Sequence, residues 1–575
     1  MAFDEIRLKT PSIPDHSAIL QKNEDQILQS PHTVMNYYYR VPAGSNLEVA
    51  AAPLKNPVTG KILISSGDKE TKRIDLAVKK NDSASKKISL EPFAGQIVKF
   101  SFCIADDASQ PQTPTESTLK NGVLWSKLKI DKAENDLDEQ TPTKTAPLNK
   151  FKKSIRNLDV IYIVFDAFNA KHSNIYGYNR DTTPFLAQLS KRGIVFDHFF
   201  ANQPYTLAST ATLLTSTYCD EHGLIRHQNR LSPVVQTLPE ILSDHDVASY
   251  LITGHTYFKE TWGLQRGFTD VFFDLKYNNQ ANEIRNALET IYQSANDQTA
   301  QKFIYLHLMP PHAPYEPPEK YQTFHQENHT PISVSSETLQ KIQDKEIEAS
   351  QSQLEHIKAM YDANILFADA IAQKIVDFLE SRQLKEKTII FFTSDHGEAF
   401  MEHGFTTHND SIYDDMLHIP FIISTPEKIQ TERKNIPNIA SIVDIKPTLL
   451  DIFNIRATDR LKGTSLLPTL FEESAKGHMD HIYLETLART GQIGIRDLNY
   501  KLIIAPDGNE LFDLQKDPAE QNNCFNERPL IAGYYLQKLK RYQDQNERAG
   551  TGGDVNIENL DEKTLNQLKE LGYIK

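Results

Sequence analysis

Three stretches of the chain are continuously apolar, and each leads into polar residues able to do chemistry. Residues 160–165 (V-I-Y-I-V-F) stop at Asp166, residues 388–392 run into 393–398 (T-S-D-H-G-E), and residues 303–306 precede a proline-rich segment. Runs rich in β-branched and aromatic residues are typical of parallel strands covered on both faces. The pattern therefore predicts an α/β protein with a mostly parallel central sheet.

Helical patterns alternate with these strands, as a doubly wound sheet requires. Residues 182–184 (T-T-P) indicate the start of a helix that stops at Gly193, with Pro in the first turn. Residues 353–381 predict a long helix with an apolar stripe at a spacing of four residues: Phe367, Ile371, Ile375 and Leu379. This stripe is expected to face the core.

Residues 33–130 follow a different pattern, with short alternating segments broken by Pro, Gly, Asn and Asp. That spacing favours a β-sandwich or jelly roll. Aromatic side chains at Tyr37, Tyr38, Tyr39 or Trp125 would suit glycan binding, while a domain that only packs against the catalytic unit explains the pattern equally well. The expected organisation is an N-terminal β-sandwich-like domain (1–131), a linker (132–152), a catalytic domain (153–475), a small C-terminal subdomain (476–545) and a tail helix (546–575).

The polar residues at the ends of the strands are expected to meet. In open α/β sheets, ligands bind beyond the carboxyl ends of the strands, so Asp166, Asp395, His396 and His312 can converge there. Carboxylates beside a neutral imidazole are ligands for a metal ion. His307, inside the third strand, is interpreted as a core residue or as a residue behind the ligands.

Thr206 is a candidate nucleophile. It precedes a short segment of small and apolar residues, 207–215, that is predicted to be helical. A hydroxyl at a helix N-terminus meets free backbone N–H groups and the positive end of the dipole, which favour an anionic substrate. Ser209, one helical turn away, is the alternative nucleophile.

Composition narrows the function classes. The 575 residues include 62 basic and 76 acidic side chains, a formal net charge of −14, which argues against a nucleic-acid surface. Three cysteines, without metal spacing, constrain the redox compartment weakly. No signal peptide or apolar run long enough to span a bilayer is evident, so the chain is expected to be soluble as given. It would be either cytoplasmic or an exported or cell-surface protein without its leader.

Nine motifs occur in an order that resembles the sulfatase family of the alkaline-phosphatase superfamily, from about Asp159 onward. They are V-I-Y-I-V-F-D-A, Y-G-Y-N-R-D-T-T-P-F-L, Y-T-L-A-S-T-A-T-L-L-T-S with E-H-G-L, R-G-F-T-D, Y-L-H-L-M-P-P-H-A-P-Y-E-P-P, T-S-D-H-G-E-A-F-M-E-H-G, I-Y-D-D-M-L-H-I-P-F-I-I, V-D-I-K-P-T-L-L-D and E-L-F-D-L-Q-K-D-P-A-E-Q-N-N. The resemblance implies an alkaline-phosphatase-like sandwich, joined here by the N-terminal β-sandwich and the C-terminal subdomain.

The departures from the family pattern concern the chemistry. Thr206 stands where sulfatases carry the Cys or Ser that becomes formylglycine, and threonine cannot undergo that conversion. The paired aspartates that begin the sulfatase metal site are Asp166 and Ala167 here, and His408 replaces a downstream lysine. These changes resemble the threonine branch of the superfamily, which includes phosphoethanolamine and phosphoglycerol transferases and phosphodiesterases.

Carried over by motif, one divalent metal ion at least is expected, with zinc, manganese, magnesium and calcium equally compatible. Its ligands would be Asp166, Thr206, Asp395 and His396. His312 and His408 would contact the substrate and protonate its leaving group, and His255 lies near a substrate-contacting lysine of sulfatases.

The function expected from this branch is hydrolysis or transfer of an anionic phosphoester, preferably a glycan- or lipid-linked phosphodiester, through a phosphothreonine at Thr206. Two alternatives remain open. One is a sulfatase that cleaves sulfuric esters without formylglycine. The other is a catalytically degenerate glycan-binding protein.

Overall fold

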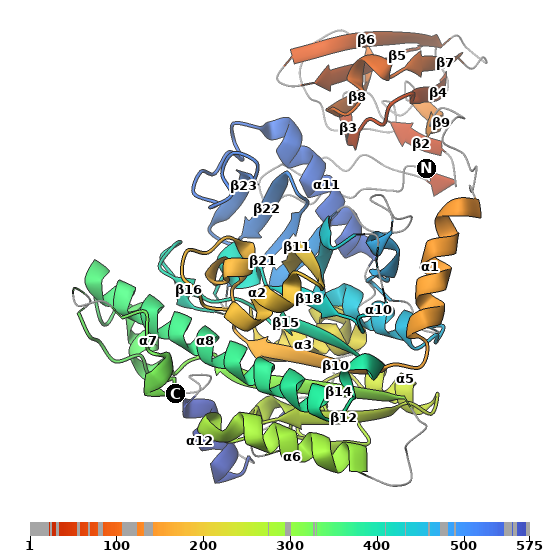
Figure 1. Ribbon diagram of the computed structural model, residues 1–575. Coiled ribbons are helices and arrows are strands. Elements are labelled where there is room, and N and C mark those ends of the chain that lie inside the picture. Colours follow the sequence, from red (N-terminus) through yellow and green to blue (C-terminus); the bar gives the residue numbers. More distant parts are fainter. Residues whose placement is uncertain are drawn as a thin grey trace. The chain divides into compact units, whose positions relative to one another are not determined.

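The computed structural model describes most of the chain (Figure 1). The described residues are 22–23, 26–29, 34–53, 58–66, 69–78, 84–105, 123–131, 142–273, 275–293, 301–325, 328, 330–408, 410–429, 431, 433–457, 461–471, 481–487, 490–545, 555 and 560–570. They belong to two compact units. One comprises residues 1–141 and 524–545, and the other comprises residues 142–523 and 546–575.

The larger unit is built on an eight-stranded sheet with the strand order β13-β12-β14-β10-β15-β18-β11-β19. Neighbouring strands run parallel except at β18, which is antiparallel to both β15 and β11. The strands are β10 (Asp159–Asp166), β11 (Ile194–Phe200), β12 (Ala248–Thr253), β13 (Asp270–Phe272), β14 (Lys302–Pro311), β15 (Thr388–Ser394), β18 (Phe421–Ser424) and β19 (Asn435–Ser441). The mostly parallel α/β sheet predicted from the apolar runs is therefore confirmed.

Strand β10 shows why the strands of this sheet have continuously apolar sequences. Val160, Tyr162 and Val164 belong to one hydrophobic core, and the alternate residues Ile161, Ile163 and Phe165 belong to another. Successive side chains of a strand point to opposite faces, so both faces must be covered by helices.

Helices flank the sheet in Figure 1. Those of the larger unit are α1 (Pro142–Ile155), α2 (Pro184–Ser190), α3 (Thr206–Thr215), α4 (Cys219–His222), α5 (Leu238–Ser243), α6 (Gln280–Gln293), α7 (Ser336–Gln343), α8 (Gln351–Ser381), α9 (Asp414–Leu417), α10 (Ile445–Ile452) and α12 (Glu562–Glu570). The stripe from Phe367 to Leu379 on α8 is buried in the same core as Ile161. Its prediction as a core stripe is confirmed.

Smaller sheets complete the unit. An antiparallel sheet contains β20 (Ile482–Thr486), β21 (Gln492–Arg496), β22 (Tyr500–Ala505) and β23 (Gly508–Asp513), and a short pair is formed by β16 (Ala399–Phe400) and β17 (Thr406–Thr407). Helix α12 at the C-terminus contacts η6 (Thr256–Phe258), where the Thr256 hydroxyl donates to Gln567 at 2.6 Å.

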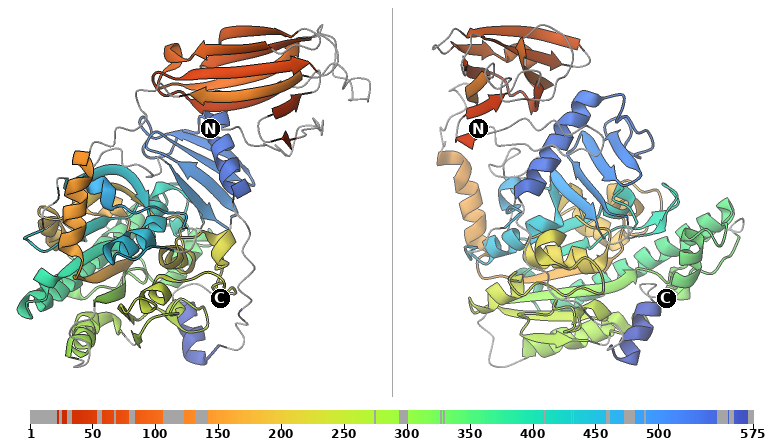
Figure 2. Two further views of the ribbon diagram at one scale, coloured as in Figure 1. Left: turned by 90° about the vertical axis from the view of Figure 1, so that its right-hand side faces the viewer. Right: turned by 180° about the vertical axis from the view of Figure 1, so that it is seen from behind.

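The second unit has two antiparallel sheets, which Figure 2 shows as facing layers. One contains β1 (Lys22–Asn23), β2 (Gln26–Gln29), β4 (Asn46–Pro53), β7 (Ala84–Ser89) and β9 (Val123–Asp131). The other contains β3 (Val34–Arg40), β5 (Val58–Ser66), β6 (Lys69–Val78) and β8 (Ile97–Ala105). Leu47 and Val49 from one sheet share a core with Ile62 and Phe100 from the other, as in a β-sandwich.

Helix α11 (Pro529–Gln545) belongs to this second unit, although the sequence placed it in a C-terminal subdomain. Gln537 exchanges hydrogen bonds with the backbone of Tyr38, at 2.9 and 3.0 Å. A side chain added at Gly533 would meet the Tyr38 ring, so helix and strand pack closely. This docking, rather than chain order, decides which unit the helix joins.

The tyrosines proposed for glycan binding are engaged in packing. Tyr37 is buried, and Tyr38 and Tyr39 are half-buried, with Tyr39 packed against the core of the sandwich. The Trp125 side chain lies outside the described part of the chain. The packing explanation of these tyrosines therefore fits the structure better than an exposed aromatic platform.

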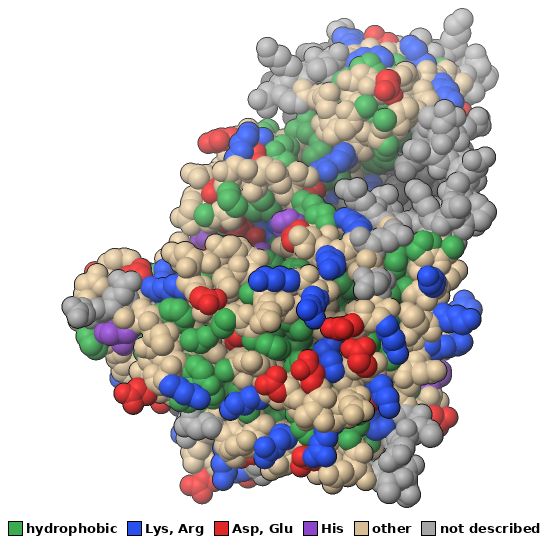
Figure 3. All heavy atoms as spheres, in the orientation of Figure 1, with side chains coloured by type: hydrophobic (Ala, Val, Ile, Leu, Met, Phe, Trp, Pro, Cys, Tyr) green, Lys and Arg blue, Asp and Glu red, His purple; other side chains and the backbone are tan. Residues whose placement is uncertain are grey.

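Helix α1 covers residues 142–155, so the chain is helical over part of the segment expected to be a linker. Its buried residues Phe151 and Ile155 join the core of the larger unit, which stabilises the helix. No helix in the described residues is long and apolar enough to cross a membrane. Figure 3 shows Lys and Arg side chains interspersed with Asp and Glu on the face it presents.

Candidate active site

The candidate site lies at the carboxyl ends of three adjacent strands. Asp166 is the last residue of β10, and Asp395 and His396 follow directly after β15. β14 pairs with β10 on its other side, with His307 opposite Val164. Because the three strands are parallel neighbours, residues far apart in sequence reach the same point.

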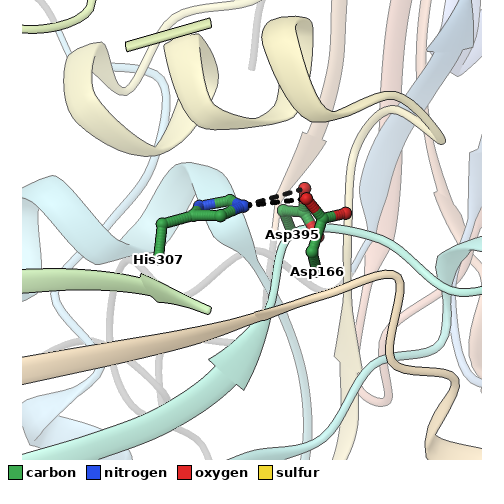
Figure 4. A group of neighbouring side chains, drawn as sticks. All are labelled: Asp166, His307 and Asp395. Atoms are coloured by element: carbon green, nitrogen blue, oxygen red, sulfur yellow. Dashed lines mark hydrogen bonds and ion pairs between the residues drawn. The ribbon is translucent and has the colours of Figure 1, made fainter. Parts of the chain in front are cut away.

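His307 faces two carboxylates (Figure 4). Its Nε2 atom lies 3.1 Å from Asp166 Oδ2 and 4.0 Å from Asp395 Oδ2. Asp166, His307 and Asp395 are fully buried, and one ligand atom from each lies within 4.8 Å of the others. His307 was interpreted as a core or supporting residue, and the structure adds it to the residues that could hold a metal ion. An imidazole inside an apolar strand faces this point because β14 lies beside β10.

The carboxylates fit a bound cation. Asp166 Oδ1 and Asp395 Oδ2 are buried without a hydrogen bond among the described residues. Leaving such oxygens unsatisfied is costly, and a divalent metal would satisfy both. This cluster is where the described residues offer the ligands for such an ion.

The two carboxyl groups differ in their electrostatics. Burial and the neighbouring charge of Asp395 raise the pKa of Asp166 well above its ordinary value. Burial acts the same way on Asp395, but the imidazoles of His396 and His307 outweigh it and lower the pKa of Asp395. The Ala167 N–H also donates to Asp395 Oδ1 at 3.1 Å. Asp395 therefore keeps its charge more readily than Asp166.

His396 presents a lone pair to the site. Its Nδ1 lies 2.9 Å from the Gly397 carbonyl oxygen, which can only accept, so Nδ1 carries the proton in the neutral ring. Its Nε2 lies 3.5 Å from Asp395 Oδ2 and 3.8 Å from Asp166 Oδ1. This atom can bind a metal.

Thr206 is the first residue of helix α3, as predicted, and it is fully buried. Its hydroxyl oxygen lies 3.1 Å from His396 Nε2, so the helix N-terminus meets the metal cluster. The Ser209 hydroxyl instead donates to the Asp395 carbonyl at 2.6 Å. That bond occupies Ser209 in holding the loop after β15.

His312 and His408 face each other, with ring centroids 5.1 Å apart, and the His408 ring lies 4.2 Å from that of His396. The Nδ1 of His312 donates to the Ala313 carbonyl at 2.6 Å, so the neutral ring carries its proton on Nδ1. The Nδ1 of His408 lies 2.9 Å from Glu398 Oε1.

Glu398 is a site residue that sequence reasoning missed. It is buried, it accepts a hydrogen bond from Tyr315 at 2.8 Å, and burial raises its pKa to about 7. The signal was present, since Glu398 ends the motif T-S-D-H-G-E, but its partner His408 lies ten residues further along.

His255 acts as a donor. The backbone N–H of Tyr257 donates to its Nδ1 at 3.1 Å, so the neutral ring carries its proton on Nε2. That Nε2 lies 3.6 Å from Asp166 Oδ2. Burial, followed by the neighbouring imidazoles, keeps the pKa of His255 low. A neutral donor here suits an anionic oxygen better than a metal.

The structure brings all seven candidate residues into one buried cluster: Asp166, Thr206, His255, His312, Asp395, His396 and His408. It adds His307 and Glu398. The catalytic and binding roles assigned to these residues stay a prediction.

Comparison with known proteins identifies the family. Residues 159–455, just over half of the chain, match the model of the Sulfatase family, and residues 401–545 match the model described as N-sulphoglucosamine sulphohydrolase, C-terminal. Arylsulfatase K from Mus musculus is 34% identical over 33% of this chain and 36% of its own length. Arylsulfatase K from Homo sapiens is 25% identical over 68% of this chain and 82% of its own length. The chain thus spans about a third of the mouse relative.

Solved structures agree on the fold. BT4656 in complex with its substrate D-glucosamine-2-N,6-O-disulfate has a TM-score of 0.56 at 19% identity, covering 68% of this chain and 98% of that one. The phosphonate monoester hydrolase of Agrobacterium radiobacter has a TM-score of 0.56 at 20% identity, covering 71% and 98%. The alkaline-phosphatase-like fold expected from the motifs is confirmed.

One expectation is contradicted. The substitution of Thr206 for the formylglycine precursor suggested a phosphoesterase or phosphotransferase, but the curated relatives are named arylsulfatases and the matching family model is that of sulfatases. The phosphoester function is therefore wrong, because it gave three departures, at Thr206, Ala167 and His408, more weight than the rest of the motif series. The chain is an enzyme of the sulfatase superfamily, and it belongs to the sulfatase family.

Proposed function

We propose that this protein hydrolyses sulfuric esters carried on a sugar. The observation that carries the proposal is the sulfatase family match, because residues 159–455 contain every member of the buried cluster from Asp166 to His408. The cluster offers buried carboxylates for a cation and imidazole N–H groups for an anion, and a sulfate ester presents such an anion.

A sulfated sugar is the favoured substrate class. The second family model carries the name of a sulphoglucosamine sulphohydrolase, and the fold neighbour BT4656 was solved with a disulfated glucosamine as its substrate. A sulfate group needs donors around its oxygens, and the Nε2–H of neutral His255 supplies one. His408 in its protonated form supplies another.

The proposed reaction starts at Thr206. A bound divalent metal would withdraw charge from the sulfate oxygens and hold Thr206 as its alkoxide, the hydroxyl proton having passed to solvent before the cycle begins. The Thr206 oxygen then bonds to sulfur while the bond from sulfur to the sugar oxygen breaks, and the protonated His408 gives its proton to that sugar oxygen. Glu398, 2.9 Å from His408 Nδ1, orients the ring and stabilises its charged form.

Water completes the proposed cycle. Neutral His408 takes a proton from a water molecule whose oxygen bonds to sulfur, the bond from sulfur to the Thr206 oxygen breaks, and hydrogen sulfate leaves. A formylglycine hydrate can instead expel sulfate by elimination, a route that threonine lacks. A sulfated Thr206 is therefore expected to accumulate during turnover.

The test compares the hydrolysis of 4-nitrophenyl sulfate and glucosamine 6-sulfate by the metal-loaded protein with that by Thr206→Ala and Thr206→Ser. We expect at least a ~100-fold loss of turnover in Thr206→Ala and partial retention in Thr206→Ser, which keeps the hydroxyl. Mass spectrometry of acid-quenched protein should find one sulfo group on the peptide that contains Thr206.

Two results would contradict the proposal. Sulfate release that survives Thr206→Ala would remove Thr206 as the nucleophile. No release from either ester, with hydrolysis of 4-nitrophenyl phosphate diesters that depends on Thr206, would reject the sulfate substrate.

A further inference from the structure

The starting observation is the residue after Asp166. Ala167 stands where sulfatases place a second aspartate, and it adopts a left-handed backbone conformation with φ of 62°. Its N–H donates to Asp395 Oδ1 at 3.1 Å, and the His396 N–H donates to the same oxygen at 2.9 Å. Asp395 therefore directs Oδ2 to the site, and the cluster has fewer carboxylate ligands than the family pattern provides.

His307 lies where a replacement ligand is needed. Its Nε2 is within 3.1 Å of Asp166 Oδ2 and 4.0 Å of Asp395 Oδ2. Its Nδ1 lies 3.4 Å from the Tyr305 hydroxyl, which can accept the ring proton. In that tautomer Nε2 offers its lone pair to a cation between the carboxylates.

The donor set is therefore half nitrogen. Asp166 and Asp395 contribute carboxylate oxygens, and His307 and His396 contribute imidazole nitrogens. His255 adds no ligand in its neutral form, because its Nδ1 accepts from Tyr257 and its Nε2 carries the proton. Two carboxylates and two imidazoles balance the charge of a divalent ion.

This set suits one class of metal. Calcium takes about six to eight oxygen ligands, mostly carboxylates, carbonyls and waters. Zinc binds about four ligands and accepts imidazole nitrogen together with carboxylate oxygen. Nitrogen donors generally favour late first-row metals over calcium and magnesium.

We propose that His307 supplies the metal ligand that Ala167 does not, and that the resulting site selects zinc over calcium. The inference deepens the proposed function, since it concerns the metal of the same site. It does not depend on which ester the enzyme cleaves, because selectivity is a property of the ligands alone.

The test measures binding directly. Full-length protein is stripped of metal with a chelator, and its affinities for Zn²⁺ and Ca²⁺ are determined by competition with a chromophoric chelator. We expect Zn²⁺ to bind at least ~100-fold more tightly than Ca²⁺. Co²⁺, as a spectroscopic substitute, should give visible absorption bands of a four-coordinate ion.

Two variants test the role of His307: one removes its imidazole, and the other restores the carboxylate that it is proposed to replace. His307→Gln should weaken Zn²⁺ binding at least ~10-fold and alter the Co²⁺ spectrum. Ala167→Asp restores the carboxylate of the family at a left-handed position that Asp adopts more readily than Ala, and it should tighten Ca²⁺ binding at least ~10-fold. His245→Gln changes an exposed histidine and should alter neither affinity.

Tighter binding of Ca²⁺ than of Zn²⁺ by the unmodified protein would overturn the inference, as would unchanged Zn²⁺ affinity and Co²⁺ bands in a folded His307→Gln variant. Tighter binding of Ca²⁺ together with sulfate ester turnover would leave the proposed function intact while removing this inference. Selective zinc binding without turnover of any sulfate ester would leave this inference intact and contradict the proposed function.

Discussion

Two clusters of buried carboxylates in the larger unit are held in opposite ways. In the metal cluster, Asp166 and Asp395 face imidazoles and keep two oxygens without hydrogen bonds among the described residues. In the second cluster, which we call the ionic network, the acids Asp414, Asp415 and Glu520 meet the bases Lys171, Arg496 and Lys501.

The ionic network compensates its charges internally. Lys501 lies 2.8 Å from Asp414 and 2.7 Å from Glu520, and it is fully buried. Although burial acts in the opposite direction, the hydrogen bond from His403 and the ammonium of Lys171 lower the pKa of Asp415 to about 2. Buried carboxylates can therefore be structural when Lys or Arg side chains neutralise them. At the metal cluster the described residues place no Lys or Arg beside Asp166 and Asp395, which indicates a ligand from outside.

The largest expected effect follows from breaking the ionic network. Lys501→Met should lower the free energy of unfolding by ~3–5 kcal/mol, because Asp414 and Glu520 would stay buried with one cation fewer. Urea unfolding measures the loss. Lys516→Met, at a side chain that is 72% exposed, is the control and should change little. Equal stability of the two variants would show that the network contributes nothing.

A second prediction concerns the neutral histidine beside the network. Burial lowers the pKa of His418 to about 4, and Arg496 and Lys171 act in the same direction against Asp414. Between pH 6.5 and 4 the unfolded chain binds one more proton at His418, so this residue alone should remove ~1.4 kcal/mol of stability per pH unit as the pH falls, about 2 kcal/mol by pH 5.

His418→Gln should remove that part of the acid sensitivity. Between pH 6.5 and 5, its free energy of unfolding is expected to fall less steeply than that of the unmodified protein. The two slopes should differ by ~1.4 kcal/mol per pH unit, the contribution of one proton. His245→Gln, at an exposed site, should keep the original slope. An unchanged slope in His418→Gln would mean that His418 is protonated in the folded state.

The third prediction tests whether a buried carboxylate of the metal cluster costs stability when no metal is bound. Asp166→Asn removes the carboxyl group whose pKa is raised by burial and by the charge of Asp395, so the metal-free protein should become more stable by ~1 kcal/mol at pH 7. Added metal should no longer raise its melting temperature, because ligand binding stabilises only a protein that retains the site. Thermal unfolding with and without Zn²⁺ measures both effects. A less stable metal-free variant would show that Asp166 is a structural residue like Asp414.

The smallest effect is expected at the surface. Arg192 and Glu427 lie 2.9 Å apart with side chains that are 83% and 76% exposed. Solvent screens such a pair, so Arg192→Gln should leave the urea midpoint unchanged within error. A marked loss of stability in Arg192→Gln would show that an exposed ion pair contributes to stability as the buried ionic network does.

The sequence by itself determined the class of the sheet and the positions of most site residues. The apolar runs at 160–165 and 388–392 predicted strands buried on both faces, and Asp166 and Asp395 follow directly because parallel strands end at one edge. The helix beginning at Thr206 was also predictable, since the residues that indicate it are adjacent in the sequence. The substrate class was misjudged, because it was derived from three departures, at Thr206, Ala167 and His408, and not from the motif series as a whole.

Only the tertiary structure decided the features that depend on pairing between distant segments. His307 becomes a ligand candidate because β14 pairs with β10 across 141 residues, and Glu398 meets His408 through the fold of the loop after β15. The ionic network joins Asp414 to Lys501 across 87 residues. The identity of a single residue does not show which distant residue it will contact in the fold. A continuously apolar run does predict a buried strand, because burial on both faces selects an apolar side chain at every position of the run.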